Sequence, residues 1–241
     1  MPTPANLLYR NNFMNLQDFE QRYTPKSIND IVFSSDHSRD LIDDLINGDR
    51  PFPLHEGKCG ILLYGIPGTG KSALAKLLPD AMEQVKTGNP AYARYVRIQH
   101  NTNGCLMLDK LQAQAQVIPF ATYHYFVLDE VDLLTTTAMD TLKSLMNMPN
   151  CVFFLTTNNL SKISAGVRDR CHCISFNAAD PVRWLPICRK ILSDEGIAGI
   201  SDQALISVIQ TANGSARNIL DAVISIVLSV KRQQNAVHSV V

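Results

Sequence analysis

Eight consecutive residues, Gly65 to Ser72, have the types and spacing that can hold a triphosphate chain. The segment Gly-Ile-Pro-Gly-Thr-Gly-Lys-Ser matches the phosphate-binding P-loop pattern G-x-x-x-x-G-K-[S/T] at every fixed position. Its glycines let the backbone curl so that successive N–H groups point at phosphate oxygens. We expect Lys71 to reach the β- and γ-phosphates and the Ser72 hydroxyl to ligate Mg²⁺. The other nucleotide contacts expected from this loop are Pro67, Gly68, Thr69 and Gly70.

The segments on both sides of this loop give the motif the context that it needs. Residues 59–64 form a short apolar run that is typical of a buried strand, and residues 73–78 have the composition of a helix start. A helix that begins here adds the partial positive charge of its N-terminus to the phosphate site. The alternative is a glycine-rich turn that matches by chance, and the flanking strand and helix argue against it.

Two adjacent carboxylates follow a second apolar run about sixty residues downstream. Residues 123–128 predict a buried strand, and Asp129 and Glu130 come directly after it, as in a Walker B motif. We expect Asp129 to hold Mg²⁺ through a water and Glu130 to orient and polarise the attacking water. The alternative is a solvated acidic turn, which the P-loop upstream makes less plausible. Asp132 is expected to be a helix cap or turn residue rather than a metal ligand.

Asn158 ends a third apolar run, over residues 151–157, which we expect to lie beside the P-loop strand. An amide at that position can hydrogen-bond both the γ-phosphate and the attacking water. Asn is also common in turns, and its position alone leaves the two interpretations even.

The elements around these residues alternate between strand and helix. Strands are predicted over 59–64, 92–98, 123–128, 151–157 and 173–176, and helices over 35–46, 73–85, 106–116, 138–148 and 167–170. This order predicts an α/β domain with a parallel sheet and a ligand at the carboxyl ends of the strands. After residue 181 only helices are predicted, over 182–195, 201–211 and 216–231. We therefore expect an N-terminal arm (1–20), a P-loop α/β domain (21–178) and a small all-helical lid domain (179–241).

Composition limits the function classes. The 241 residues are 46% hydrophobic, which is ordinary for a globular protein with a core, and 22 Lys+Arg balance 22 Asp+Glu. A balanced charge predicts no nucleic-acid partner by itself, although a local basic face remains compatible with it. We expect no membrane span and no signal peptide. Six cysteines in or beside apolar runs favour a reducing, cytoplasmic compartment, and the C-x-C spacing of Cys171 and Cys173, with Cys188, argues against a zinc site.

The order of these motifs resembles that of the AAA+ ATPases and, within them, the clamp-loader ATPase subunits of DNA replication. Residues 22–32 look like the family's Tyr-Arg-Pro-Lys box, with Thr24 in place of its Arg, and residues 129–132 stand where the family has Asp-Glu-Ala-Asp. Residues 154–159 are similar to the sensor-1 strand. Residues 168–171 resemble the Ser-Arg-Cys motif, with Asp169 replacing Ser. The resemblance covers nearly the whole chain from about residue 20.

The resemblance implies a role for individual residues. Asn158 would be sensor 1, Arg170 an arginine finger that acts on a neighbouring subunit's ATP, and Arg217 the sensor 2 that reaches the γ-phosphate from the lid. The adenine would be framed by the segment before the P-loop, through Tyr23, Pro25, Ile31 and Val32. Without the family pattern, either arginine would be interpreted as a surface salt-bridge residue.

The resemblance also implies a function. We expect an Mg²⁺-dependent ATPase that assembles with copies of itself or with homologous subunits into a ring or spiral, and that acts on DNA, a sliding clamp or another DNA-bound protein. Clamp-loader subunits carry a third helical domain, the collar, which we do not expect within 241 residues. One alternative is an AAA+ loader of a helicase or regulator of a transposase. Another, from a different class, is a nucleotide-dependent assembly protein that hydrolyses ATP little.

Overall fold

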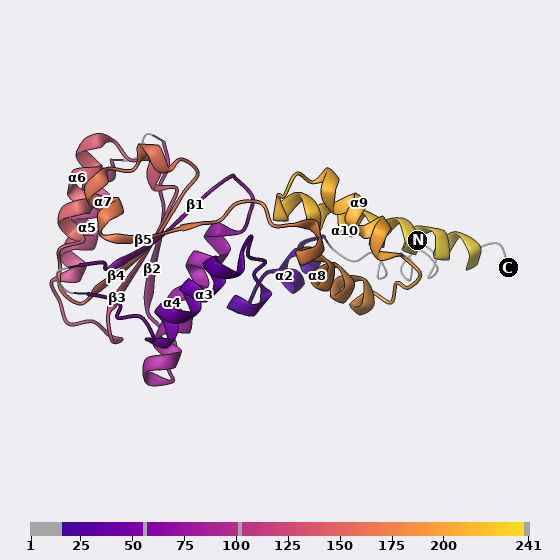
Figure 1. Ribbon diagram of the computed structural model, residues 1–241, viewed down its shortest axis with the longest axis horizontal. Coiled ribbons are helices and arrows are strands. Elements are labelled where there is room, and N and C mark those ends of the chain that lie inside the picture. The colour runs from indigo at the N-terminus through magenta and orange to yellow at the C-terminus, as the bar shows by residue number, and fades with distance from the viewer. Residues whose placement is uncertain (1–15, 55–56, 101–102, 239–241) are drawn as a thin grey trace, which may run out of the picture.

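The computed structural model describes residues 16–54, 57–100 and 103–238, and its centre is a five-stranded sheet (Figure 1). All strand pairs are parallel, in the order β2-β3-β4-β1-β5. The strands are β1 (Gly60–Tyr64), β2 (Ala93–Arg97), β3 (His124–Asp129), β4 (Cys151–Thr157) and β5 (Cys171–Ser175). This sheet confirms the predicted α/β class, and β4 lies beside the P-loop strand β1 as expected.

Helices cover both faces of the sheet, which explains why the central strands are apolar along their whole length. Residues of β3 and β4 are buried throughout, as in parallel sheets that are covered on both sides. One face carries α3 (Asp36–Asn47) and α4 (Lys71–Thr87). The other carries α5 (Gly104–Ala115), α6 (Thr136–Leu145) and α7 (Ala165–Asp169). Short 3₁₀ turns complete this part as η1 (Ile28–Asp30), η2 (Val131–Leu133) and η3 (Leu160–Lys162).

Local signals in the sequence set most helix ends. Ser35 caps α3 by accepting a hydrogen bond from the backbone N–H of Ser38, and Gly48 ends the helix in the left-handed conformation. Helix α4 continues through Pro79 to Thr87, two residues beyond the predicted end. Strand β5 begins at Cys171 instead of the predicted residue 173, because the chain pairs with β1 from Gly60 onward.

A second group of helices has its own apolar core. It comprises α2 (Leu16–Tyr23), α8 (Pro181–Asp194), α9 (Asp202–Thr211) and α10 (Ala216–His238), and Figure 1 shows it beside the α/β part. Phe19 of α2 is buried against this core, together with Trp184, Ile191 and Val223. The predicted arm lies outside the described residues up to position 15, and α2 spans the boundary that we predicted at residue 20.

Direct contacts join the helical part to the P-loop. The backbone N–H of Ala216, at the start of α10, donates to the carbonyl of Gly68 at 2.8 Å. A Cβ atom on Gly68 would lie only 2.5 Å from Ser215 Oγ, so this contact depends on glycine. On the other side, Arg183 of α8 forms two hydrogen bonds with Asp36, at 2.7 and 3.0 Å. The helical part is thereby held over the carboxyl end of β1.

Candidate active site

A cavity of about 460 Å³ lies where the helical part meets the carboxyl ends of β1, β3 and β4. Ligands of open parallel sheets bind at this edge. The cavity brings together all but one of the site residues predicted from the sequence: Tyr23, Pro25, Ile31, Val32, Pro67, Gly68, Thr69, Gly70, Lys71, Ser72, Asp129, Glu130, Asn158 and Arg217. The exception is Arg170, which does not line it.

The P-loop connects β1 to α4, and its backbone conformation requires glycine at several positions. Gly68 and Gly70 have φ values of +82° and +102°, a region that L side chains rarely adopt. Lys71 is 6% exposed, and its Nζ donates to the carbonyls of Gly65 at 3.0 Å and Ile66 at 2.6 Å. Burial lowers the pKa of Lys71, while nearby carboxylates act in the opposite direction. The ammonium therefore lies inside the loop whose backbone is expected to surround phosphates.

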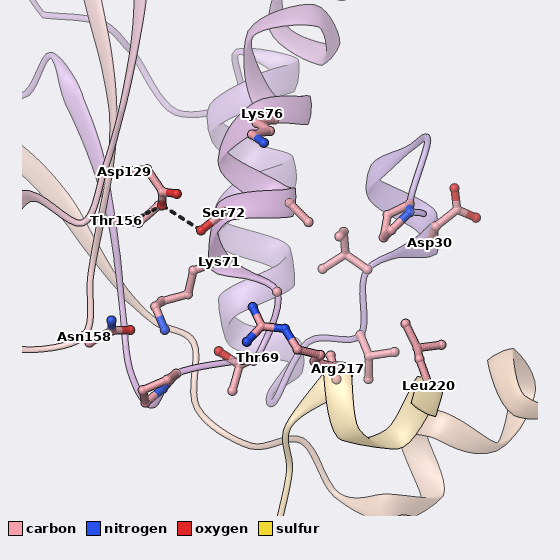
Figure 2. Close-up of a pocket in the computed structure, with 18 of the residues that line it drawn as sticks. Asp30, Thr69, Lys71, Ser72, Lys76, Asp129, Thr156, Asn158, Arg217 and Leu220 are labelled. Atoms are coloured by element: carbon pink, nitrogen blue, oxygen red, sulfur yellow. Dashed lines mark hydrogen bonds between the residues drawn. The ribbon is translucent and has the colours of Figure 1, made fainter. Parts of the chain in front are cut away.

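Asp129 at the end of β3 is held by three hydroxyl groups. Its Oδ1 accepts from Ser72 Oγ at 2.6 Å and from Thr156 Oγ1 at 2.5 Å, contacts that Figure 2 marks. Its Oδ2 accepts from the Tyr95 hydroxyl at 2.9 Å, and the residue is 4% exposed. A carboxylate and a hydroxyl are oxygen ligands of the kind that Mg²⁺ prefers, so the adjacent Ser72 and Asp129 fit a magnesium ion bound with phosphates.

Glu130 adopts a left-handed backbone conformation with φ +63°, which is uncommon for a residue with a side chain. Its backbone N–H donates to Thr156 Oγ1 at 3.0 Å. Its carboxylate pairs with the Arg97 guanidinium of β2, at 3.0 Å from Nη2 to Oε1 and 3.3 Å from Nε to Oε2. In this arrangement the carboxylate is held at the sheet edge by a cation.

Asn158 and Asp132 have separate roles at the end of β4. The Asn158 side chain lines the cavity, on the side where Figure 2 shows the Lys71 ammonium. Asp132 lies in η2, and its Oδ1 accepts from the Thr157 hydroxyl at 2.9 Å and from the Asn158 backbone N–H at 3.3 Å. Asp132 thus fixes the turn that presents Asn158, in agreement with its expected role as a turn residue.

The other end of the cavity, where Figure 2 shows Leu220 and Asp30, is mostly apolar. Tyr23, Pro25, Ile31 and Val32 line it from the N-terminal segment, and the helical part contributes Trp184, Ile187 and Leu220. The Tyr23 hydroxyl donates to Glu195 at 3.1 Å. Among the buried side-chain nitrogen and oxygen atoms of the described residues, only the indole nitrogen of Trp184 has no hydrogen-bond partner. An apolar end opposite a phosphate-binding loop suits the base of a nucleotide.

The two predicted arginines occupy different positions. Arg217, in the first turn of α10, lines the cavity, and Figure 2 shows its guanidinium directed from the helical part toward the P-loop. Arg170 follows α7 and donates from Nε to Asn147 Oδ1 at 2.8 Å and from Nη1 to the Gly166 carbonyl at 2.9 Å. Arg170 is therefore held away from the cavity of its own chain.

Sequence reasoning missed several polar residues at the cavity, and four of them lie close to the proposed metal and catalytic residues. Thr156 and Tyr95 bond Asp129, Arg97 bonds Glu130, and Lys76 lies one turn beyond Ser72 on α4. Tyr95 and Arg97 are two residues apart on β2 and therefore share a face of the strand. The sequence shows this spacing, but it does not show that β2 pairs with β3 or in which register the two strands pair.

Cys188 lies apart from Cys171 and Cys173. Cys171 and Cys173 lie on β5, whereas Cys188 is buried in the helical core, and no three His, Cys, Asp or Glu side chains gather as a metal site within the described residues. In the same part of the chain, no helix is long and apolar enough to cross a membrane.

Comparison with known proteins agrees with the geometry. The family model described as the ATPase family associated with various cellular activities (AAA) matches residues 61–177. No curated protein matches the chain. The matched segment extends from β1 to the end of the sheet and contains the P-loop, Asp129, Glu130 and Asn158. This match and the parallel sheet fit an α/β P-loop domain of the AAA type over this part of the chain.

Proposed function

We propose that the chain is an Mg²⁺-dependent ATPase that assembles into a ring or spiral and couples ATP binding and hydrolysis to work on DNA or on a DNA-bound protein, as clamp loaders do. The observation that carries the hydrolytic part is the 2.6 Å contact between Ser72 and Asp129 in a cavity that also contains Lys71 and Glu130. The cavity thus contains a phosphate-binding loop, two oxygen ligands suited to Mg²⁺ and a candidate general base.

Each residue has a role that follows from its position. The P-loop N–H groups and Lys71 bind the phosphates, which requires the Lys71 ammonium to exchange its two carbonyl partners for phosphate oxygens. Ser72 and Asp129 hold Mg²⁺, which when bound neutralises charge on the β- and γ-phosphates. Glu130 orients and polarises the attacking water, and Asn158 hydrogen-bonds the same water or the γ-phosphate. Arg217 adds positive charge from the helical part.

The proposal of an assembly rests on Arg170. An arginine that is held outside its own cavity by Asn147 and Gly166 is available to a neighbouring subunit, where it would stabilise charge on the transferred phosphoryl group. The DNA part of the proposal rests on the motif resemblance alone. A loader of a helicase or a transposase regulator would use the same nucleotide chemistry.

A second candidate function is a nucleotide-dependent assembly protein with little turnover. The Arg97–Glu130 ion pair favours it, because a carboxylate paired with a guanidinium has to leave that pair before it can polarise water. The two functions differ in turnover and not in ATP binding.

The test is to measure ATP binding, ATP turnover and oligomeric size in Mg²⁺ and in EDTA, with and without primed DNA. We expect Mg²⁺-dependent turnover that primed DNA stimulates, and an ATP-dependent increase in size. Lys71→Ala should weaken ATP binding by at least about tenfold, since it removes hydrogen bonds from a charged donor. Lys86→Ala, on the last turn of the same helix, is the matched control. ATP-driven assembly without turnover would favour the second candidate, and an unaffected Lys71→Ala would contradict the site itself.

A further inference from the structure

Tyr95 contacts the one Asp129 oxygen that the P-loop does not engage. Asp129 Oδ1 is shared by Ser72 and Thr156, whereas Oδ2 accepts the Tyr95 hydroxyl at 2.9 Å. The donor comes from β2, the edge strand next to β3, where the register pairs Tyr95 with Val127. Tyr95 therefore reaches along the sheet to the end of the neighbouring strand, and it is one of the residues that line the cavity.

A second contact holds the Tyr95 ring. The Lys76 ammonium lies 4.3 Å from the ring centre, in the geometry of a cation–π interaction. Lys76 follows Ser72 by one helical turn on α4, so the same helix that carries Ser72 also restrains the ring. Burial, followed by the hydrogen bond to Asp129, raises the pKa of Tyr95 to about 12. The hydrogen bond to Asp129 and the ring contact with Lys76 together hold the Tyr95 side chain in place.

The hydrogen bond from Tyr95 to Oδ2 matters because the Asp129 carboxylate can rotate about its terminal torsion. The terminal torsion of Asp is broad and roughly two-fold, so hydroxyls on Oδ1 alone leave the plane of the group weakly fixed. A donor on Oδ2 defines that plane and leaves Oδ1 facing Ser72. Outer partners of metal-binding carboxylates act in this way, and their loss typically costs 10–100-fold in metal affinity or activity.

We propose that Tyr95 is a positioning residue of the Mg²⁺–ATP site, which orients the Asp129 carboxylate toward Ser72 while Lys76 holds the Tyr95 ring. The inference rests on the proposed function, because it concerns the metal that Ser72 and Asp129 would hold. It adds a residue from the edge strand β2 to the metal site proposed at Ser72 and Asp129.

The test compares Tyr95→Phe with Tyr92→Phe in the full chain. Both changes delete a phenolic hydroxyl and keep the ring, and Tyr92 lies in the segment that enters β2 and is largely exposed. The measurement is the affinity for a fluorescent ATP analogue in Mg²⁺ and in EDTA, both in the Glu130→Gln background to suppress turnover. In Tyr95→Phe the affinity in Mg²⁺ should fall about tenfold, whereas the affinity in EDTA should not change. The ratio of the affinity in Mg²⁺ to that in EDTA should therefore fall about tenfold. Tyr92→Phe should leave both values unchanged.

Three other outcomes would overturn the proposal. An unchanged ratio in Tyr95→Phe would show that Asp129 does not need this hydroxyl. An equal loss of affinity in Mg²⁺ and EDTA would assign Tyr95 a general structural role instead. If the parent chain itself binds ATP no better in Mg²⁺ than in EDTA, the proposed metal site is wrong, and the role of Tyr95 falls with it. The parent measurement therefore separates failure of the proposed function from failure of this inference.

Discussion

Arg97 and Glu130 form a two-point ion pair between the last residue of β2 and the residue that follows β3, with contacts of 3.0 and 3.3 Å. The Arg97 side chain is largely exposed and that of Glu130 is partly exposed. The pair ties the proposed base of the reaction to the edge of the sheet. It must open, or shift, before the Glu130 carboxylate can act on a water near the γ-phosphate.

Arg97→Ala should therefore raise unstimulated ATP turnover. An exposed ion pair contributes about 0.2–1 kcal/mol. Because 1.36 kcal/mol corresponds to a tenfold rate, releasing Glu130 should increase the rate by no more than about fivefold. The measurement is steady-state turnover without DNA, with Arg94→Ala, an exposed arginine on the same strand, as control. A lower rate in Arg97→Ala would mean that Arg97 assists the reaction directly and does not restrain Glu130.

Trp184 should report nucleotide binding by its fluorescence. It is the single tryptophan of the chain, it lines the apolar end of the cavity, and it is 6% exposed. A nucleotide base beside Trp184 would change the surroundings of the indole ring. We expect a shift or quenching of emission that saturates with ATP, and no such response in Lys71→Ala at the same concentrations. Constant emission while ATP displaces a fluorescent analogue would place the base elsewhere.

The sequence was sufficient for features that depend on local patterns. Apolar runs and, for β2, partial alternation predicted the five strands, and the P-loop pattern identified Lys71 and Ser72 because one short segment carries the whole motif. Asp129 was found for a similar reason, since a carboxylate directly after a buried strand reaches the sheet edge. The roles of these residues in catalysis remain predictions, although their convergence on one cavity is observed.

Features that depend on pairing between distant segments were not predictable from the sequence. Tyr95 and Arg97 lie on a strand with mostly exposed residues, and they meet Asp129 and Glu130 only through the register of β2 on β3. The start of β5 was displaced because pairing with β1 extends the strand through His172, which the apolar pattern did not predict. Phe19 joined the helical core for the same reason, as a contact between residues far apart in the chain.

Glu83 should make the fold sensitive to acid. This carboxylate is 2% exposed and accepts hydrogen bonds from the Tyr125 hydroxyl at 2.7 Å, from Thr122 and from Thr87. Burial acts to raise the pKa of Glu83, but these hydrogen bonds outweigh it, so that the pKa is lower than the ordinary value of 4.5. The stabilisation is therefore complete above the unfolded-state pKa and is lost as the pH falls through the folded-state value.

Glu83→Gln tests this contribution. The change should reduce the free energy of unfolding by about 1–3 kcal/mol at neutral pH, since it weakens the acceptor of buried donors. It should also lessen the loss of stability that the unchanged chain shows below about pH 4.5. Urea unfolding at neutral and acidic pH measures both effects, and Tyr125→Phe with the double variant isolates the coupling between the two side chains. Equal acid sensitivity in Glu83→Gln and the unchanged chain would contradict the assignment.

Arg170→Ala should keep ATP binding and lose most turnover. The guanidinium is held outside its own cavity, so a role in hydrolysis requires a neighbouring subunit. Arginine fingers contribute roughly 10³–10⁵ in rate in the best-characterised cases. Arg168→Ala removes an exposed arginine from α7, the short helix that precedes Arg170, and is the matched control, with thermal unfolding of both variants to compare their stability. Undiminished turnover in Arg170→Ala would exclude the finger.

Mixing two inactive variants tests whether Arg170 acts between subunits. Glu130→Gln chains keep Arg170 and lose the proposed base, and Arg170→Ala chains have the opposite defect. In a mixed assembly some interfaces combine an intact Arg170 from one chain with an intact Glu130 from the next, so part of the turnover should return. An Arg170 that acts within its own chain would give no recovery, because no single chain in the mixture holds both residues. Recovery should also depend on the mixing ratio and be greatest when the variants are present in comparable amounts. If mixed assemblies form, as judged by co-purification of differently tagged chains, and turnover stays absent, the inter-subunit mechanism is wrong.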